Sequence, residues 1–458
     1  MQSRFESLRE DYKTFIYNGY KLSQVDGFIA IEYDFEMSGI KFAPTIRIRT
    51  QNLNIVNDYD SDMAKQIVFN LGMVELVSYW KCACPPQIIV RCGELSIDDC
   101  NWWKKLYYNG LGEFFYKNGI KTEFDNFVSI EAKEKTNEIS HEYKKSGINI
   151  VPVGGGKDSN VTMELLKQCK ENNFCFTVND QPAREESANA AGYEDNRIIR
   201  TYRTIDKELL RLNSEGFLNG HTPFSAIVAF LSLYCAYLIG GEYIVLSNES
   251  SANEGNIDGT DINHQYSKSF EFECDFNSYV EKNITKDVKY FSLLRAFNEL
   301  QIAKQFSALP KFHSIFKSCN VGSKKNIWCA NCAKCLFVYI ILSPFLSQES
   351  LVGIFGENLL NKQGLREIFD GLVGFSSVKP FECIGTKSEI NAALEKTVEN
   401  MKNNQQDFPL LLEYYSEKVD NLNSAEFNFL IKEFNSENNV PQKFMTYVRE
   451  MYDYVASV

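Results

Sequence analysis

The sequence is poor in positive charge, in histidine and in proline. Of its 458 residues, 48 are Lys or Arg and 60 are Asp or Glu, which gives a net charge of −12. A chain with this balance has no excess of cations to cover phosphates, which argues against broad, salt-driven binding of nucleic acid. Only 11 prolines and four histidines are present. With 44% hydrophobic and 24% charged residues, the composition excludes a mostly disordered or collagen-like chain.

The sequence also lacks a recognisable secretory signal and a clear membrane span. The N-terminus, MQSRFESLREDYK, is charged and has no apolar core. One run without charge, residues 224–241, just reaches the length of a membrane span. It contains Ser, Tyr and Cys, however, and leads directly into a strand-like segment, YIVLSNE. We therefore predict a buried helix of an α/β domain, no membrane contact and a cytoplasmic location.

Hydrophobic periodicity predicts a three-part chain. Residues 1–140 are expected to form a β-rich N-terminal domain with one or two helices, including a helix over 61–80 with Ser61 as its N-cap. Residues 141–388 alternate between strands and helices, which predicts a parallel sheet with helices on both faces. Residues 389–458 are expected to be a helical tail without catalytic motifs. The expected strands are 27–33, 45–55, 88–92, 148–153, 174–179, 197–203 and 243–247, and the expected helices of the middle part are 160–168, 184–191, 224–241, 292–309 and 336–342.

Four of the 13 cysteines lie close together near the end of the middle part. Cys319, Cys329, Cys332 and Cys335 are spaced so that two CxxC steps follow one another. Four thiolates complete a tetrahedral zinc ion, which is typical of a structural site. An iron–sulfur cluster or a redox disulfide would also use such cysteines. Zinc is favoured because the chain shows no motif for a partner cofactor, and the other thiols are expected to be free, as in a reducing compartment.

A glycine-rich turn lies between the expected strand 148–153 and the helix that follows. Glycines let the backbone approach a phosphate closely, and a helix N-terminus offers unpaired N–H groups to an anion. Lys157 can contact phosphate as a point charge, Asp158 can bind Mg²⁺, and Ser159 can cap the helix and touch a phosphate oxygen. The spacing is neither that of Walker A nor that of the dinucleotide GxGxxG.

The turn resembles the PP-loop, SGGxDS, of ATP pyrophosphatases, which split ATP into AMP and diphosphate. Gly154 stands where that pattern has Ser. The resemblance implies a PP-loop fold (adenine nucleotide alpha hydrolase-like) with ATP bound at the turn and Mg²⁺ at Asp158. A plain glycine turn is the alternative reading. The residues assigned to ATP are Gly154, Gly155, Gly156, Lys157, Asp158 and Ser159.

Further segments, taken in chain order, resemble the UDP-N-acetylmuramoyl-L-alanyl-L-glutamate epimerases of bacterial peptidoglycan synthesis. The resemblance extends over about residues 71–385, and Gly154 in place of Ser agrees with it. Residues 1–70 and the tail match weakly. The matching segments are 77–88, 107–120, 219–226, 246–256, 262–273, 318–345 and 379–385.

This resemblance implies an isomerase that converts the terminal L-Glu of the UDP-muramoyl dipeptide to D-Glu with ATP and Mg²⁺. A proton beside a free carboxylate is hard to remove, because a carbanion would form next to a negative charge. Adenylation of the α-carboxylate removes that charge, so that a base can take the proton and an acid can return it from the other face. The implied partners are the dipeptide substrate and ATP, and no protein partner is inferred. The N-terminal part is expected to help hold the UDP-sugar.

Five residues of the matching segments are candidates for acid and base. His264 and His221 are considered because imidazole titrates near neutrality. Lys268 can bind a carboxylate or diphosphate, and Glu249 ends a strand at the edge where α/β sheets place ligand groups. Cys383 is a candidate thiol base. Local hydrogen bonding, capping or burial is the alternative role at each position.

Two other functions remain open from the sequence. The first is a PP-loop enzyme that acts on a nucleobase, like 7-cyano-7-deazaguanine synthase, in which similarly spaced cysteines follow the PP-loop. The second is a non-enzymatic module that binds zinc and a nucleotide.

Overall fold

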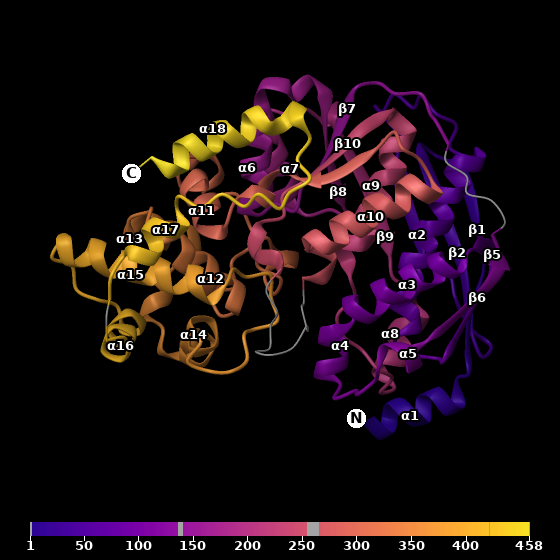
Figure 1. Ribbon diagram of the computed structural model, residues 1–458, viewed down its shortest axis with the longest axis horizontal. Coiled ribbons are helices and arrows are strands. Elements are labelled where there is room, and N and C mark those ends of the chain that lie inside the picture. Colours follow the sequence, from indigo (N-terminus) through magenta and orange to yellow (C-terminus); the bar gives the residue numbers. More distant parts are fainter. Residues whose placement is uncertain (1, 136–140, 254–264, 421, 458) are drawn as a thin grey trace.

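One large mixed sheet organises the molecule (Figure 1). The computed structural model describes residues 2–135, 141–253, 265–420 and 422–457. Within these residues, ten strands follow the order β11-β10-β7-β8-β9-β4-β2-β1-β5-β6, and β3 pairs with β2. The strands are β1 (Thr14–Val25), β2 (Phe28–Met37), β3 (Ile40–Phe42), β4 (Thr45–Arg49), β5 (Gln87–Leu95), β6 (Ser129–Glu134), β7 (Ile148–Pro152), β8 (Asn173–Val178), β9 (Ile198–Thr204), β10 (Gly241–Leu246) and β11 (Lys289–Ser292).

Strands β7 to β11 form one half of the sheet, which we call the parallel half. They lie side by side in the order β9-β8-β7-β10-β11, and all four pairings are parallel. The chain moves outward in one direction from β7 and then returns to place β10 on the other side of β7. Sheets of this kind bind ligands beyond the carboxyl ends of the strands at such a reversal. The glycine turn follows β7 and Glu249 follows β10, so both lie at this point.

Helices cover both faces of the parallel half, as predicted. Ile150 and Ile244 belong to the core that contains α9 (Phe224–Ile239). Their neighbours Val151 and Val245 belong to the other core, which contains α11 (Glu299–Ser307). Because successive side chains of a strand point to opposite faces, these two cores lie on opposite sides of the sheet.

Strands β1 to β6 form the other half, which we call the mixed half. Here β2 pairs antiparallel with β1, β3 and β4, whereas β5 pairs parallel with β1 and β6. The predicted parallel sheet concerns residues 141–388, whereas the strands of this half lie before residue 136, where the sequence predicts a β-rich part. Ser61 caps α2 (Asp62–Trp80) by accepting from the Ala64 N–H, as predicted. The part before residue 136 holds five α-helices among its described residues, more than predicted.

The two halves are joined by an antiparallel pairing of β4 with β9. In this pairing Thr45 faces Thr204 and Ile48 faces Thr201. The sheet thus continues from strands before residue 140 to strands after it. The division into residues 1–140, 141–388 and 389–458 stays a prediction.

The α-helices that follow β11 gather at the opposite end of the molecule from β1, β5 and β6 (orange and yellow in Figure 1). They enclose the second core, and the predicted helical tail is confirmed. The α-helices not yet given are α1 (Gln2–Asp11), α3 (Ile97–Gly110), α4 (Gly112–Lys117), α5 (Phe124–Phe127), α6 (Lys157–Leu165), α7 (Pro182–Ala190), α8 (Lys207–Ser214), α10 (Phe270–Asn283), α12 (Ala333–Leu342), α13 (Gln348–Phe355), α14 (Arg366–Val373), α15 (Lys387–Asn403), α16 (Leu410–Lys418), α17 (Ala425–Leu430) and α18 (Met445–Ala456).

The uncharged run 224–241 forms the buried helix that the sequence predicted. Thirteen of the sixteen residues of α9 are buried, from Ala226 to Ile239. Gly240 ends the helix with a φ of +76°, where a Cβ would lie 2.6 Å from the Ser146 hydroxyl. In the part of the chain that the structure describes, no helix has both the length and the apolar character to cross a membrane.

The predicted helix 292–309 is wrong at its start. Ser292 is the last residue of β11, and a short 3₁₀ turn, Leu293–Ala296, follows it. The helix α11 begins only at Glu299, because Asn298 and Gln301 form a capping box around its first turn. The local capping signal outweighed the apolar periodicity of the preceding residues.

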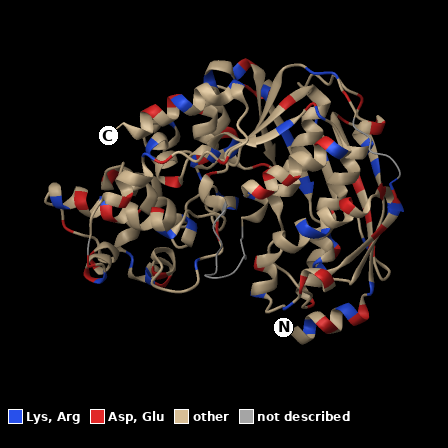
Figure 2. Cartoon of the chain, viewed as in Figure 1, with Lys and Arg blue, Asp and Glu red and all other residues tan. Residues whose placement is uncertain are grey.

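Acidic and basic residues are interspersed on the elements in view (Figure 2). The net charge of −12 is thus spread over both halves of the sheet and the helical end of the molecule in this view rather than gathered on one element.

Candidate active site

The glycine turn (residues 154–159) joins β7 to α6 at the carboxyl edge of the parallel half. Gly155 has a φ of +81°, and a Cβ there would lie 3.1 Å from the Cβ of Ala183. Glycine is therefore required at this position. At Gly154 a Cβ would meet nothing within 4 Å, so the Ser that PP-loops carry at this position would fit without a steric conflict.

The helix after the turn begins three residues earlier than predicted. Gly156 is the N-cap of α6, and no side chain caps the helix. Ser159 lies in the first turn, and its hydroxyl donates to the Gly156 carbonyl oxygen at 3.1 Å. The prediction that Ser159 caps the helix is therefore wrong. The uncapped N–H groups of the first turn give the kind of end at which anions bind in other proteins.

Lys157 is buried, with 2% of its surface exposed, and pairs with two carboxylates, those of Asp158 and Glu299. Burial lowers the pKa of Lys157, but Asp158, Glu299 and Glu249 outweigh it and raise that pKa. Burial raises the pKa of Glu299 to about 8, against the opposing effect of Lys157. Burial also acts to raise the pKa of Asp158, yet the nearby lysines, above all Lys157, bring it below its usual value. Several charges thus meet in one buried site.

The first turn of the helical tail reaches this site. Glu389 of α15 is buried and accepts from the Glu299 N–H at 2.8 Å and from the Ser251 hydroxyl. Gly385 packs so closely that a Cβ there would lie 2.7 Å from a Glu389 carboxylate oxygen and 3.0 Å from Glu299. The segment around 383–389 therefore packs against Glu299, one of the two carboxylates that pair with Lys157.

Three of the five predicted acid–base candidates lie near one another. The ammonium of Lys268 contacts the sulfur of Cys383 at 3.1 Å. Burial lowers the pKa of Lys268, but Cys383 and Glu249 outweigh it and raise that pKa. Glu249 follows β10 and is 5% exposed. The structure thus places a thiol, an ammonium and a carboxylate within electrostatic reach of the glycine turn.

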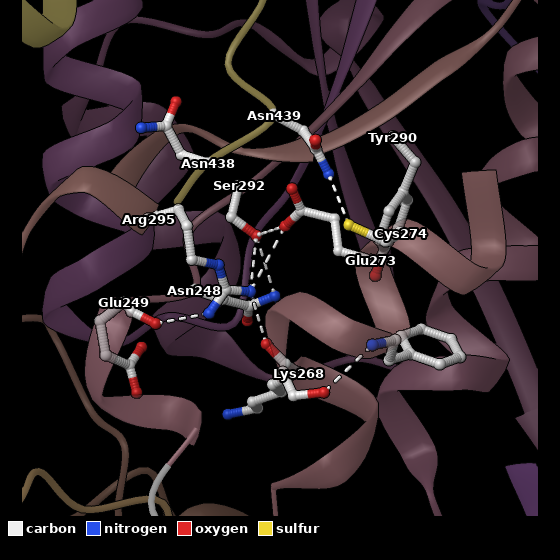
Figure 3. A network of polar contacts seen from close by, with 12 residues as sticks. Asn248, Glu249, Lys268, Glu273, Cys274, Tyr290, Ser292, Arg295, Asn438 and Asn439 are labelled. Atoms are coloured by element: carbon white, nitrogen blue, oxygen red, sulfur yellow. Dashed lines mark hydrogen bonds and ion pairs between the residues drawn. The ribbon is translucent and has the colours of Figure 1, made fainter. Parts of the chain in front are cut away.

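A fully buried arginine holds two of these residues by their backbone (Figure 3). Arg295 donates to the carbonyl oxygens of Glu249 and Lys268, each at 2.6 Å. Its charge is matched by Glu273, which lies at 3.3 Å. Burial raises the pKa of Glu273, although Arg295 opposes the shift. Arg295 therefore fixes the two ends of the segment 249–268 relative to each other.

The histidine predictions have different outcomes. His264 lies outside the described residues. His221 lies 3.3 Å from Glu113 of α4, and Lys81 contacts its carbonyl oxygen at 3.2 Å. The same helix α4 brings Tyr116 against Phe381, with ring centroids 5.3 Å apart. His221 thus lies beside a helix that contacts the segment of Cys383, and its catalytic role stays a prediction.

The four predicted cysteines form one cluster, which we call the cysteine turn (residues 319–335). Their sulfur atoms all lie within 4.8 Å of one another, with individual pairs at 3.5 to 3.8 Å. Thiolates at about 2.3 Å from a tetrahedral zinc ion are about 3.8 Å apart, so the geometry fits. The Gly322 N–H also donates to the Cys319 sulfur at 3.1 Å. These four cysteines could hold a metal ion.

The two residues just before the cysteine turn pack directly on the glycine turn. The Lys317 N–H donates to the Gly155 carbonyl oxygen at 2.8 Å. A Cβ on Gly156 would lie 3.3 Å from the Cβ of Ser318. Two features that the sequence shows as separate motifs are therefore one structural unit.

A cavity of about 1240 Å³ lies between α1 and the α3–α5 region. Its lining includes Asn109, whose side chain hydrogen-bonds Tyr266, and Tyr116, which contacts Phe381. The cavity therefore borders the segments that carry Lys268 and Cys383.

Sequence reasoning missed four buried charged residues of this site, Arg295, Glu299, Lys334 and Glu389. Arg295 was detectable, because it is the single charged residue of the apolar stretch YFSLLRAF. Glu299 and Glu389 look like ordinary acids in the first turn of a helix. Lys334 lies between Cys332 and Cys335, and its own sequence context does not distinguish it from a surface lysine.

Comparison with known proteins identifies the family. The family model described as MurL N-terminal domain matches residues 6–293, and that described as MurL C-terminal domain matches residues 311–427. A protein of Xanthomonas oryzae pv. oryzae (strain MAFF 311018) is 33% identical over 332 residues, 71% of this chain and 72% of the relative. One of Salinispora tropica is 33% identical over 71% of both chains, and one of a Micromonospora species is 32% identical over 72% and 74%. All three are named UDP-N-acetyl-alpha-D-muramoyl-L-alanyl-L-glutamate epimerase. The chain belongs to the MurL family of epimerases, and so to the isomerases.

Proposed function

We propose that this protein epimerises the terminal L-Glu of UDP-N-acetylmuramoyl-L-alanyl-L-glutamate to D-Glu, with ATP and Mg²⁺, in the cytoplasm, for peptidoglycan synthesis. The names of the three relatives support the substrate. The observation that carries the ATP step is the glycine turn, which combines a positive φ at Gly155 with an uncapped helix end beside Lys157 and Asp158. The nucleobase and non-enzymatic alternatives are set aside because the family is that of epimerases.

The α-carboxylate of the substrate attacks the α-phosphorus of ATP in the first step. A carboxylate–phosphate bond forms, the bond to the β-phosphate breaks, and diphosphate leaves. The mixed anhydride no longer carries the negative charge that opposes loss of the α-proton. A base removes this proton and an acid returns one to the opposite face. Water then hydrolyses the anhydride, which gives AMP and the D-Glu product.

The residues of the buried site divide this work between them. The glycine turn and the first N–H groups of α6 hold the phosphates. Asp158, with Glu299 close by, offers the carboxylate oxygens that Mg²⁺ prefers, and the ion would neutralise phosphate charge there. Lys157 keeps these two carboxylates together. We assign the UDP-sugar to the 1240 Å³ cavity, because its lining borders the segments of Lys268 and Cys383.

Lys268 and Cys383 form the acid–base pair that the geometry favours. Their 3.1 Å contact lets the ammonium stabilise a thiolate, so that the sulfur can take a proton. Glu249, His264 and His221 are the further candidates for the opposite face. A Lys268→Met variant should retain formation of AMP but lose epimerisation, which separates proton transfer from adenylation.

One assay tests the reaction. The protein is incubated with the L-Glu substrate, ATP and Mg²⁺ in deuterated water, and AMP and the deuterium at Cα of Glu are measured. We expect AMP to form and the D-Glu product to carry deuterium. If neither AMP nor deuterium exchange is detected, the proposal fails. Epimerisation without ATP would contradict the adenylation step.

The cysteine turn is proposed to hold a structural zinc ion. The Cys332→Ser variant should lose metal and stability together, because binding of the ion depends on four thiolates. A mass measurement of metal content and a thermal melt give both values. A variant that keeps all of its zinc would refute the four-thiolate site.

A further inference from the structure

Lys334 occupies the middle of the second CxxC step of the cysteine turn. It lies between Cys332, the N-cap of α12, and Cys335. The residue is buried, with 8% of its surface exposed. A metal ion held by the four cysteines would fix the backbone on both sides of this residue.

The contacts of Lys334 differ from those of Lys157. Lys157 pairs with two carboxylates. Within the described chain, Lys334 donates one hydrogen bond, to the Cys383 carbonyl oxygen, and lies over its own helix neighbour Phe337 at 5.2 Å. It has no carboxylate partner in these residues, although an ammonium has three donors. A buried cation with no carboxylate in direct contact is costly, which points to an anion that arrives with a ligand.

The charge of Lys334 acts on two carboxylates of the site, those of Asp158 and Glu299. Lys334 contributes to the low pKa of Asp158, after Lys157, and it opposes the raised pKa of Glu299. The Cys383 carbonyl to which it donates belongs to the segment that packs against Glu299. The backbone contact of Lys317 with Gly155 sets the cysteine turn against the glycine turn. A phosphate at the glycine turn would thus lie between the end of α6 and Lys334.

We propose that Lys334 binds a phosphate group of ATP, and that the cysteine turn is the device that presents it to the glycine turn. This role rests on the proposed function for the identity of the nucleotide. The chemistry alone requires an anion with several oxygens, which a triphosphate or diphosphate provides. The cysteine turn then serves both stability and nucleotide binding.

The test is direct binding of ATP with Mg²⁺, measured by calorimetry without the dipeptide. The Lys334→Met variant removes the charge and keeps the aliphatic stem. We expect ATP to bind about 10- to 100-fold more weakly, because a charge-assisted hydrogen bond is lost. Metal content should equal that of the unchanged protein. The melting temperature without nucleotide should stay the same or rise, because an unpaired buried charge is gone, while stabilisation by ATP should shrink.

Lys362 provides the matched control. Its ammonium also binds the cysteine turn, at the Ala330 carbonyl oxygen (3.0 Å) and Asn331 (2.8 Å), but it pairs with Glu357 and is more exposed. Lys362→Met should leave the affinity for ATP unchanged. A Lys334→Met protein that binds ATP as tightly as the unchanged chain overturns the role of Lys334. An equal loss of affinity in both variants overturns it too, because the effect would then be one of the turn as a whole.

The result also separates this inference from the proposed function. If the unchanged protein binds ATP but forms no AMP with the dipeptide, the epimerisation scheme fails while a loss of affinity in Lys334→Met still supports the phosphate contact. If the unchanged protein binds no ATP, both fail. If AMP forms and Lys334→Met forms it with an unchanged KM for ATP, only the role of Lys334 fails.

Discussion

The two halves of the sheet bury polar groups in different ways. In the mixed half, the hydroxyls of Tyr33 and Tyr107 donate to backbone carbonyl oxygens of α2, and Arg203 of the adjoining strand pairs with Glu75. Each group thus has a partner within the fold. At the carboxyl ends of the parallel half, lysines and carboxylates meet around the glycine turn, and Lys334 has a neutral oxygen as its partner. The first pattern serves packing, and in our proposal the second serves a ligand.

Asp158→Asn should show the largest effect, a loss of activity without a loss of fold that sets the parallel half apart from the mixed half. The variant loses the carboxylate expected to hold Mg²⁺, so AMP formation should fall at least about 1000-fold. Lys157 keeps its pair with Glu299, so the fold should persist. The rate of AMP release and a circular dichroism spectrum measure the two. Asp34→Asn, at an exposed position on β2, is the control, and turnover by Asp158→Asn at the control's rate would remove Asp158 from the mechanism.

Ile31→Ala should show the opposite behaviour in the mixed half. Ile31 of β2 is fully buried, and its truncation should lower the free energy of unfolding by about 2 to 5 kcal/mol. The remaining folded protein should keep its kcat, because no group of the site is touched. Denaturant unfolding and kinetics at low temperature measure these values. A kcat lowered tenfold or more in fully folded protein would break the comparison.

Gly155→Ala should have a smaller effect, centred on the nucleotide. The left-handed φ of +81° costs about 1 to 2 kcal/mol for a residue with a Cβ, and the contact with Ala183 adds to it. The affinity for ATP should fall with the stability, because the turn must shift. Gly19→Ala on β1 is the control, since a Cβ there meets nothing within 4 Å. Unchanged ATP affinity in Gly155→Ala would show that the turn does not bind the nucleotide.

The smallest effect expected is a pH dependence of stability. The pKa of Glu299 is raised to about 8 in the folded protein, above its usual value of 4.5. Between these two values the folded state holds a proton that the unfolded chain has lost, so the free energy of unfolding should decrease as pH rises from about 5 to 8. Glu299→Gln should flatten this slope, whereas Glu32→Gln on the exposed side of β2 should leave it. An unchanged slope in Glu299→Gln would contradict the shifted pKa.

Local features of the fold were predictable because they depend on neighbours in the chain. The Ser61 cap, the buried helix α9 and the strand–turn–helix around Gly155 follow from residue types within a few positions of one another. The cysteine cluster also follows from spacing alone. These features include the glycine turn and the four cysteines that could hold a metal ion.

Features that depend on distant segments were not predictable in the same way. Glu389 reaches Glu299 across 90 positions, and the pairing of β4 with β9 spans more than 150. Neither acid differs in its local sequence from an ordinary helix-start residue. The expected substrate came from the family resemblance, whereas the charged residues around the glycine turn could be identified only from the structure.

The pairing of β4 with β9 also delays completion of the sheet during synthesis. Strand β4 leaves the ribosome early, but its partner follows about 150 residues later, which takes about 8 to 30 s at the usual rate of elongation. During this interval Thr45–Arg49 is an edge strand without its neighbour, and such edges attract other chains. Arg47 and Arg49 lie on this strand, where charge discourages aggregation while the nascent chain waits.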